Sequence, residues 1–175
     1  VDLKRPDDVG MIDLQQRPPG HRFFYNGSGD VRQHCRLLEH GTAYVPSATY
    51  HALMLIIHDQ FQDADYWVGK IDLRHLLDLR DLASGSDRID WQQLASLTHG
   101  HLARNAIETQ LVTLRALLGV DIPDAMLRRL MPRLQHRRRV LQARMPTLRH
   151  VLFLLTLFDY GTYRAEVGLE ERVSE

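Results

Sequence analysis

Cysteine, lysine and long apolar runs are scarce in this sequence. A single cysteine, Cys35, stands among 175 residues, which excludes a disulfide within the chain and suits the reducing cytoplasm. The longest apolar run, VLFLLTLF at residues 151–158, is well short of the roughly 20 residues that cross a bilayer. The chain also lacks the basic and then apolar start of a secretory signal. We therefore expect a cytoplasmic protein with no membrane partner.

Well-known catalytic motifs are missing as well. The chain has no His-Glu-x-x-His zinc motif, no cysteine pair, no phosphate-binding glycine loop and no Gly-x-Ser-x-Gly turn. Its net charge of zero gives no reason to expect nucleic acid as a partner. What the chain does have is a hydrophobic content of 44%, which is sufficient for a buried core.

The first 45 residues differ in pattern from the rest. Short apolar runs alternate there with proline and glycine, which is typical of short strands joined by turns. We predict a strand near residues 9–15, a second strand near 22–25, a turn at 26–30 and a short helix at 31–39.

From residue 46 the apolar residues recur with the period of a helix. Ser47, Asp72 and Asp90 each stand directly before such a stretch, where a side-chain oxygen can cap the first turn. They predict three helices, which run from 48 to about 62, from 73 to just before the SGSD at 84–87, and from 91 to about 100. A longer helix should follow and end at Gly119, because glycine readily adopts the left-handed conformation of a helix C-terminus. Pro123 should open another helix.

The remaining expectations complete an α+β fold that is predominantly α. Pro132 and Pro146 should interrupt or kink the chain, and residues 148–158 should form a last apolar helix before a polar tail at 161–175. We expect a helical domain at residues 46–160 behind the strand-bearing residues 1–45. The helix that starts after Asp72 should bury a stripe of five leucines: Leu73, Leu76, Leu77, Leu79 and Leu82.

His58 and Asp59 form an adjacent pair of the kind found in metal-dependent phosphohydrolases. His51 lies two turns earlier on the same helix face, and Asp78 or Asp81 of the next helix can complete a set of two histidines and two aspartates. The alternative is that the pair lies on the polar side of a helix that only packs.

An arginine-rich segment begins at Arg128. It holds eight arginines and no acidic residue up to residue 149, and Arg137, Arg138 and Arg139 are candidates for binding phosphate or a nucleotide. The alternative is a solvated helix face. Two Arg-to-His spacings resemble those of helical ribonucleases, but arginine and histidine are so frequent here that chance explains them.

Three segments of the chain share one family resemblance. They are VDLKRPDDVGMIDLQQRP at residues 1–18, AYVPSATYHALMLIIHDQFQDADYWVGKIDLRHLLDLRDLA at 43–83, and RIDWQQLASLTHGHLARNAIETQLVTLRALLGVDIP at 88–123. The first looks like a strand, and the other two look like the helical part, of the uncharacterised bacterial nucleotidyltransferase-like proteins. These proteins are a branch of the polymerase-beta-like superfamily, and the resemblance covers about residues 1–123.

The resemblance implies metal-dependent nucleotidyl transfer from a nucleoside triphosphate to an acceptor that the sequence does not identify. In this superfamily three carboxylates hold two divalent cations, expected to be Mg²⁺, which neutralise the triphosphate. Asp13 falls at the third carboxylate position and is the implied catalytic and metal-binding residue. Gln15 stands where the family often has histidine, which is a departure from its pattern. His58 falls on a helix near the cleft, where it can line the nucleotide or acceptor pocket.

The family's Gly-Ser helix start and its first two carboxylates have no counterpart in this sequence. We therefore expect residues 1–45 to be a remnant of the nucleotidyltransferase sheet, with the catalytic half either before Val1 or lost, and this chain not to transfer nucleotides by itself. Our leading interpretation is the C-terminal, helical and substrate-recognition part of a nucleotidyltransferase-like protein. The alternatives are a helical binding or regulatory module without catalysis and, with less support, the metal phosphohydrolase. The oligomeric state stays open.

Overall fold

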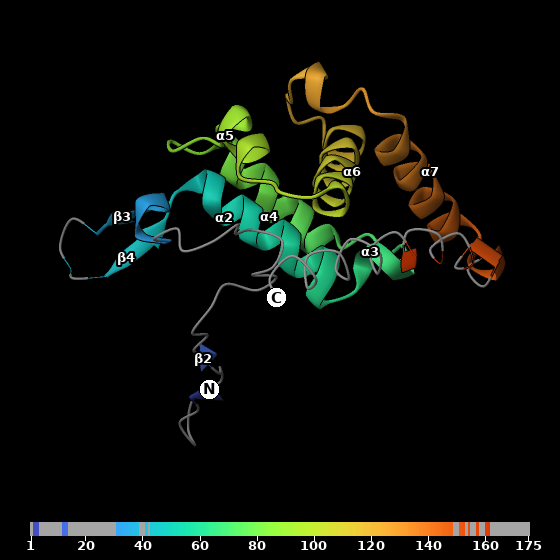
Figure 1. The fold of residues 1–175 in the computed structure, drawn as a ribbon, viewed down its shortest axis with the longest axis horizontal. Coiled ribbons are helices and arrows are strands. Elements are labelled where there is room, and N and C mark those ends of the chain that lie inside the picture. Colours follow the sequence, from blue (N-terminus) through green and yellow to red (C-terminus); the bar gives the residue numbers. More distant parts are fainter. Residues whose placement is uncertain are drawn as a thin grey trace, which may run out of the picture.

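Helices form most of the described chain, and the strands are short (Figure 1). The structure, a computed structural model, describes residues 2–3, 12–13, 31–38, 41, 43–148, 151, 152, 154, 157, 160 and 161. This confirms an α+β fold that is predominantly α. No helix of the described residues is long and apolar enough to cross a membrane.

Two antiparallel strand pairs lie toward the N-terminus. Strand β1 (Asp2–Leu3) pairs with β2 (Ile12–Asp13), and β3 (Cys35–Leu37) pairs with β4 (Tyr44–Pro46). The strand predicted at 9–15 is thus present at β2. The predictions for residues 22–25 and 26–30 lie outside the described residues.

The helix predicted at 31–39 is wrong in its second half. A 3₁₀ helix, η1 (Val31–His34), is present, but the chain then enters β3. The reason is tertiary, because β3 bonds to β4 with Cys35 opposite Pro46, and this ladder replaces the helical hydrogen bonds that a continuation would make.

Three helices begin at the predicted caps. Helix α2 (Ala48–Ile57) starts at Ser47, whose Oγ accepts the Tyr50 N–H at 3.3 Å. Helix α4 (Leu73–Ser84) starts at Asp72 and α5 (Trp91–Ser96) at Asp90, and each aspartate accepts two backbone N–H groups. These local contacts set the helix starts because a cap satisfies N–H groups that have no partner within the helix.

Two short elements lie between α2 and α4, and the remaining helices lie after α5. The chain continues from α2 into a π-helical turn, η2 (His58–Gln62), and a short helix, α3 (Asp65–Val68). Helix α6 (His101–Leu118) ends at Gly119 with φ 67°, as predicted. After a 3₁₀ turn, η3 (Asp124–Met126), come helix α7 (Leu130–Arg144) and the 3₁₀ turn η4 (Pro146–Leu148).

Of the two predicted breaks, Pro132 leaves its helix intact and Pro146 interrupts the chain. Pro132 lies in the first turn of α7, where its missing N–H needs no helical partner, so the helix runs through it. Pro146 interrupts the chain as predicted: α7 ends at Arg144, Met145 directly before the proline is no longer helical, and η4 begins at Pro146. Of the last helix predicted at 148–158, residues 151, 152 and 157 are helical and most others lie outside the described residues.

The core lies between α2, α4, α5 and α6. Its fully buried side chains come from all four helices: Leu53, Ile56, Ile57, Leu76, Leu79, Leu94, Ile107, Leu111 and Leu114. The predicted leucine stripe of α4 is only partly right, because Leu73 and Leu77 are 60% and 40% exposed. At about 100° per residue they lie about 120° and 160° around the helix from Leu79, beyond the face that packs.

Candidate functional site

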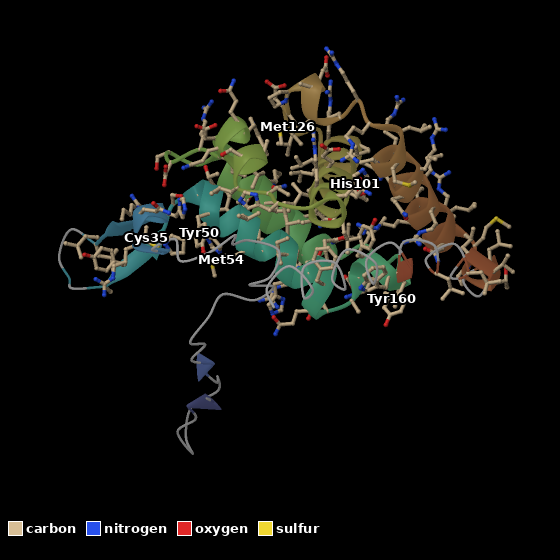
Figure 2. All side chains as sticks on the ribbon, in the orientation of Figure 1. Cys35, Tyr50, Met54, His101, Met126 and Tyr160 are labelled. Atoms are coloured by element: carbon tan, nitrogen blue, oxygen red, sulfur yellow. The ribbon has the colours of Figure 1, made fainter. Side chains whose placement is uncertain are left out.

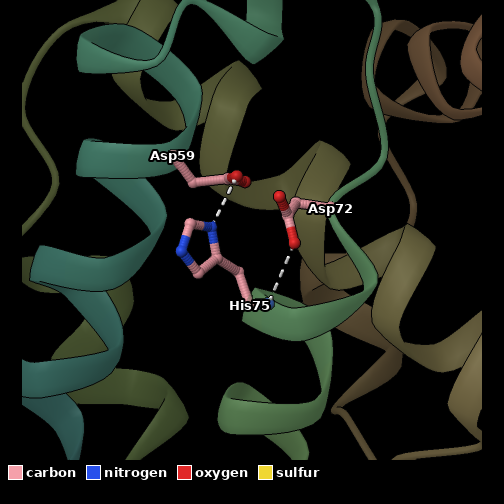
Figure 3. A group of neighbouring side chains, drawn as sticks. All are labelled: Asp59, Asp72 and His75. Atoms are coloured by element: carbon pink, nitrogen blue, oxygen red, sulfur yellow. Dashed lines mark hydrogen bonds and ion pairs between the residues drawn. The ribbon is translucent and has the colours of Figure 1, made fainter. Parts of the chain in front are cut away.

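A buried aspartate in the π-helical turn is the centre of a polar cluster (Figure 3). Asp59 is only 1% exposed, and its Oδ1 lies 2.8 Å from His75 Nδ1 on α4. Its Oδ2 accepts hydrogen bonds from the side-chain amides of Gln60 and, at 3.0 Å, Gln110 on α6. The π-helical turn η2 and helices α4 and α6 therefore meet at one carboxylate that has hydrogen-bond partners on both oxygens, as a buried charge requires.

Asp72 brings a second carboxylate to this cluster. It caps α4, and its Oδ1 accepts the backbone N–H of His75 (Figure 3). One ligand atom each from Asp59, Asp72 and His75 lies within 4.8 Å of the others. In the part of the chain that the structure describes, this is the group that can hold a metal ion. Two carboxylates and one imidazole are ligands for divalent transition metals.

Asp65 and Lys70 extend the cluster. Lys70 Nζ lies 3.4 Å from Asp65 Oδ2 and 3.1 Å from Asp72 Oδ2, so one ammonium is shared by two carboxylates. Asp65 is buried, and its Oδ2 accepts no hydrogen bond from the described residues. Burial, followed by the charge of Asp59, raises the pKa of Asp65 to about 6. A hydrogen bond from Lys70 is the main cause that lowers the pKa of Asp72.

Helix α7 contributes a buried cation to the other side of the cluster. Arg139 has no exposed surface, and its guanidinium donates to the Oε1 atoms of Gln60 and, at 3.3 Å, Gln110. It also lies over the ring of Tyr66 on α3. Burial lowers the pKa of Arg139 to about 10, so the group is charged at neutral pH and offsets the charge of the buried carboxylates.

The adjacent pair His58 and Asp59 is divided between two environments. His58 is partly exposed, and its Nδ1 lies 3.5 Å from Asp63 Oδ2 rather than in the cluster. His51, Asp78 and Asp81 line a separate groove. The two-histidine, two-aspartate set of a phosphohydrolase is therefore not assembled among the described residues.

The three consecutive candidate arginines are divided in the same way. Arg137 is exposed, whereas Arg138 and Arg139 are buried and point toward α3 and η2. Arg138 donates to the Tyr66 carbonyl at 2.8 Å. Only Arg137 of the three is accessible to a phosphate from solvent. Asp13 lies in β2 opposite Asp2 of β1.

Sequence reasoning missed most of this cluster. His75, Gln60 and Gln110 carry no motif, but one signal was available. Gln110 falls on the same helix face as Ile107, Leu111 and Leu114, where an apolar residue is expected. A polar residue in a core stripe indicates a buried polar partner on a neighbouring helix.

No family model, curated protein or solved structure matches this chain. The resemblance to nucleotidyltransferase-like proteins therefore rests on the three sequence segments alone.

Proposed function

We propose that this chain is the helical, substrate-recognition part of a nucleotidyltransferase-like protein. In this proposal the cluster of Asp59, Asp72 and His75 binds a divalent cation that accompanies the phosphates of a nucleoside triphosphate. The acceptor of the nucleotidyl group is not defined. Asp13 is the proposed catalytic and metal-binding carboxylate of the intact active centre.

One observation supports this proposal above all. The two helical segments that carry the family resemblance, residues 43–83 and 88–123, supply the candidate metal ligands and both glutamines of the cluster. The three ligands and Gln60 come from the first segment and Gln110 from the second, whereas Arg139 of α7 lies outside both. A hydrogen-bonded cluster of this kind orients its imidazole, because the Asp59 carboxylate fixes His75 through Nδ1.

The donor set fits a divalent cation. Two carboxylates supply negative charge, and the nearby Asp65 adds a third buried carboxylate, whose Oδ2 lies 3.4 Å from Lys70 Nζ. The family resemblance implies Mg²⁺, which prefers oxygen ligands, whereas an imidazole in the set favours Mn²⁺ or Zn²⁺. The bound cation would supply positive charge to phosphate oxygens. Asp59, Asp72 and His75 would hold it, and Lys70 would balance the charge of Asp72 when no cation is bound.

Asp72→Asn is the sharpest test, because asparagine keeps the cap of α4 and removes only the charge. Asp90→Asn is the matched control, since Asp90 caps α5 in the same way and lies outside the cluster. We expect the native chain and Asp90→Asn to bind Mn²⁺ with equal dissociation constants in isothermal titration calorimetry. Asp72→Asn should raise the dissociation constant at least roughly tenfold. Equal binding by Asp72→Asn, or no binding of Mn²⁺ and Mg²⁺ by the native chain, contradicts the metal site.

Nucleotide recognition needs a separate measurement. We expect a nucleoside triphosphate to bind only in the presence of the cation, and therefore to bind more weakly to Asp72→Asn than to the native chain. Unchanged binding by His58→Ala would remove His58 from the pocket. If no common nucleoside triphosphate binds with either cation, the recognition function is wrong even where the metal site is present.

A further inference from the structure

Helix α7 has an inverted polarity. The side chains that it buries are mostly polar, whereas the side chains that it exposes include three leucines. Its buried residues include Gln135, Arg138, Arg139 and Gln142, and its exposed leucines are Leu130, Leu134 and Leu141, which are 70%, 45% and 39% exposed. The hydrogen bonds of Arg138 and Arg139 to α3, η2 and α6 fix the rotation of the helix. The leucines are thus held outward.

Arginines lie among these leucines. Arg133, Arg137 and Arg144 are exposed, and none of them forms an ion pair with an acid of the described residues. At about 100° per residue, the three arginines and three leucines occupy roughly 100° of the helix circumference. We call this surface the α7 outer face: Leu130, Arg133, Leu134, Arg137, Leu141 and Arg144. Apolar side chains with arginine, and without acid or lysine, are typical of the centre of a protein interface.

A surface of complementary character lies on the same molecule. A groove of about 810 Å³ is formed by the β3–β4 hairpin, α2 and α4. Apolar side chains line it together with three aspartates, of which Asp78 has no partner among the described residues. Asp87 also accepts the Ala48 N–H, and Arg36 and His51 stand at the groove. We call this surface the acidic groove: Leu38, Leu55, Asp78, Asp81, Leu82 and Asp87.

The α7 outer face and the acidic groove cannot meet within one chain. The β3–β4 hairpin lies at one end of the long axis and α7 toward the other, with α2, α4 and α6 between them (Figure 1). Figure 2 likewise shows Cys35, on β3, far from the side chains of α7. Pairing two α7 outer faces across a two-fold axis would bring arginine against arginine, which is unfavourable.

From these observations we propose that the α7 outer face of one copy docks into the acidic groove of a second copy. The contact joins the arginines to Asp78 and Asp81 and covers the leucines of α7 with the apolar wall of the groove. It uses different surfaces on the two copies, so it builds either a closed ring or an open chain, depending on the rotation between copies.

The decisive experiment separates the two halves of the contact. One variant, Arg133→Ala with Leu134→Asn and Arg137→Ala, keeps the acidic groove and loses the α7 outer face; it gains no acid that could pair with a positively charged groove. The other, Asp78→Arg with Asp81→Arg, keeps the α7 outer face and loses the groove. We expect the native chain to self-associate with concentration in light-scattering measurements, each variant alone to stay monomeric, and an equimolar mixture to form a dimer that contains one copy of each.

Two controls keep the result interpretable. Arg104→Gln with Arg115→Gln removes two exposed charges from α6 and should leave self-association unchanged. Arg133→Gln with Arg137→Gln removes two charges from the α7 outer face and should raise the dissociation constant of self-association roughly tenfold. Circular dichroism melting checks that every variant is folded.

Three outcomes overturn the proposal. They are a native chain that stays monomeric at its highest soluble concentration, a mixture that forms no dimer, and self-association that both variants retain. If the native chain instead binds vesicles of anionic phospholipid through Arg133 and Arg137 without self-associating, the α7 outer face serves a lipid surface and the proposal is wrong.

Discussion

Arg139 is the single residue on which the buried cluster depends most. Its guanidinium is fully buried and donates to Gln60 and Gln110, which in turn donate to Asp59. Arg139→Met should fill similar space but leave buried carboxylates without a compensating cation, so we expect the free energy of unfolding to fall by about 3 kcal/mol. Urea denaturation measures this loss. Arg137→Met, on the exposed side of the same helix, is the control and should change little; an equal loss would contradict the role of Arg139.

His136 makes the stability of the fold depend on pH. Burial is the main cause that lowers the pKa of His136 from its usual 6.5, and the charges of Arg139 and Arg137 add to it. Below about pH 6.5 the unfolded chain therefore binds a proton that the folded chain does not, so stability is present above this pH and falls as the pH is lowered further. We expect His136→Asn to show a smaller loss between about pH 7.5 and 5.5 in urea denaturation. Equal losses in the two proteins would contradict this.

At the scale of elements, Gly69 lets the end of α3 lie against the Gln142 side chain of α7. It ends α3 at φ 71°, and a Cβ there would overlap the side-chain amide of Gln142 on α7. Gly119 ends α6 at φ 67° in open space, which makes it a matched control for backbone strain. Gly119→Ala should cost about 1 kcal/mol, and Gly69→Ala roughly 1–2 kcal/mol more because the buried Gln142 side chain must move. Denaturant titrations of both variants test this, and equal costs would show that the contact yields easily.

The elements that could be predicted are those fixed by neighbours in sequence. Ser47, Asp72 and Asp90 were recognisable because a cap bonds to backbone only two or three residues away. Strand β3 was missed because its hydrogen bonds go to β4 across a loop. Asp59 was recognised as a candidate ligand, but its partners were missed for the same reason on a larger scale, since Asp59 bonds to Gln110, and Arg139 to Gln60, across most of the helical array. Such contacts depend on helix packing, which the apolar period does not specify.

At the scale of the whole molecule, the zero net charge conceals a strong separation of charge. Residues 125–158 contain eight arginines and no acid, so the rest of the chain carries all 22 acidic residues and 14 basic ones, a net charge of −8. The α7 outer face belongs to the first part and the acidic groove to the second. A neutral chain can therefore attract its own copies at long range, which an even mixture of charges would not do.

If both charge and apolar contact hold two copies together, two salts at the same ionic strength should act differently. At equal ionic strength, sodium chloride and sodium sulfate screen the arginine–aspartate attraction to the same extent. Sulfate, however, also strengthens the burial of apolar side chains. We therefore expect self-association to weaken as chloride is raised and to be stronger in sulfate than in chloride at equal ionic strength. Leu134→Gln should abolish that difference, because Leu134 is one of the exposed leucines that the contact covers. Sedimentation equilibrium in both salts measures it. A difference that persists in Leu134→Gln would place the apolar contact elsewhere on the molecule.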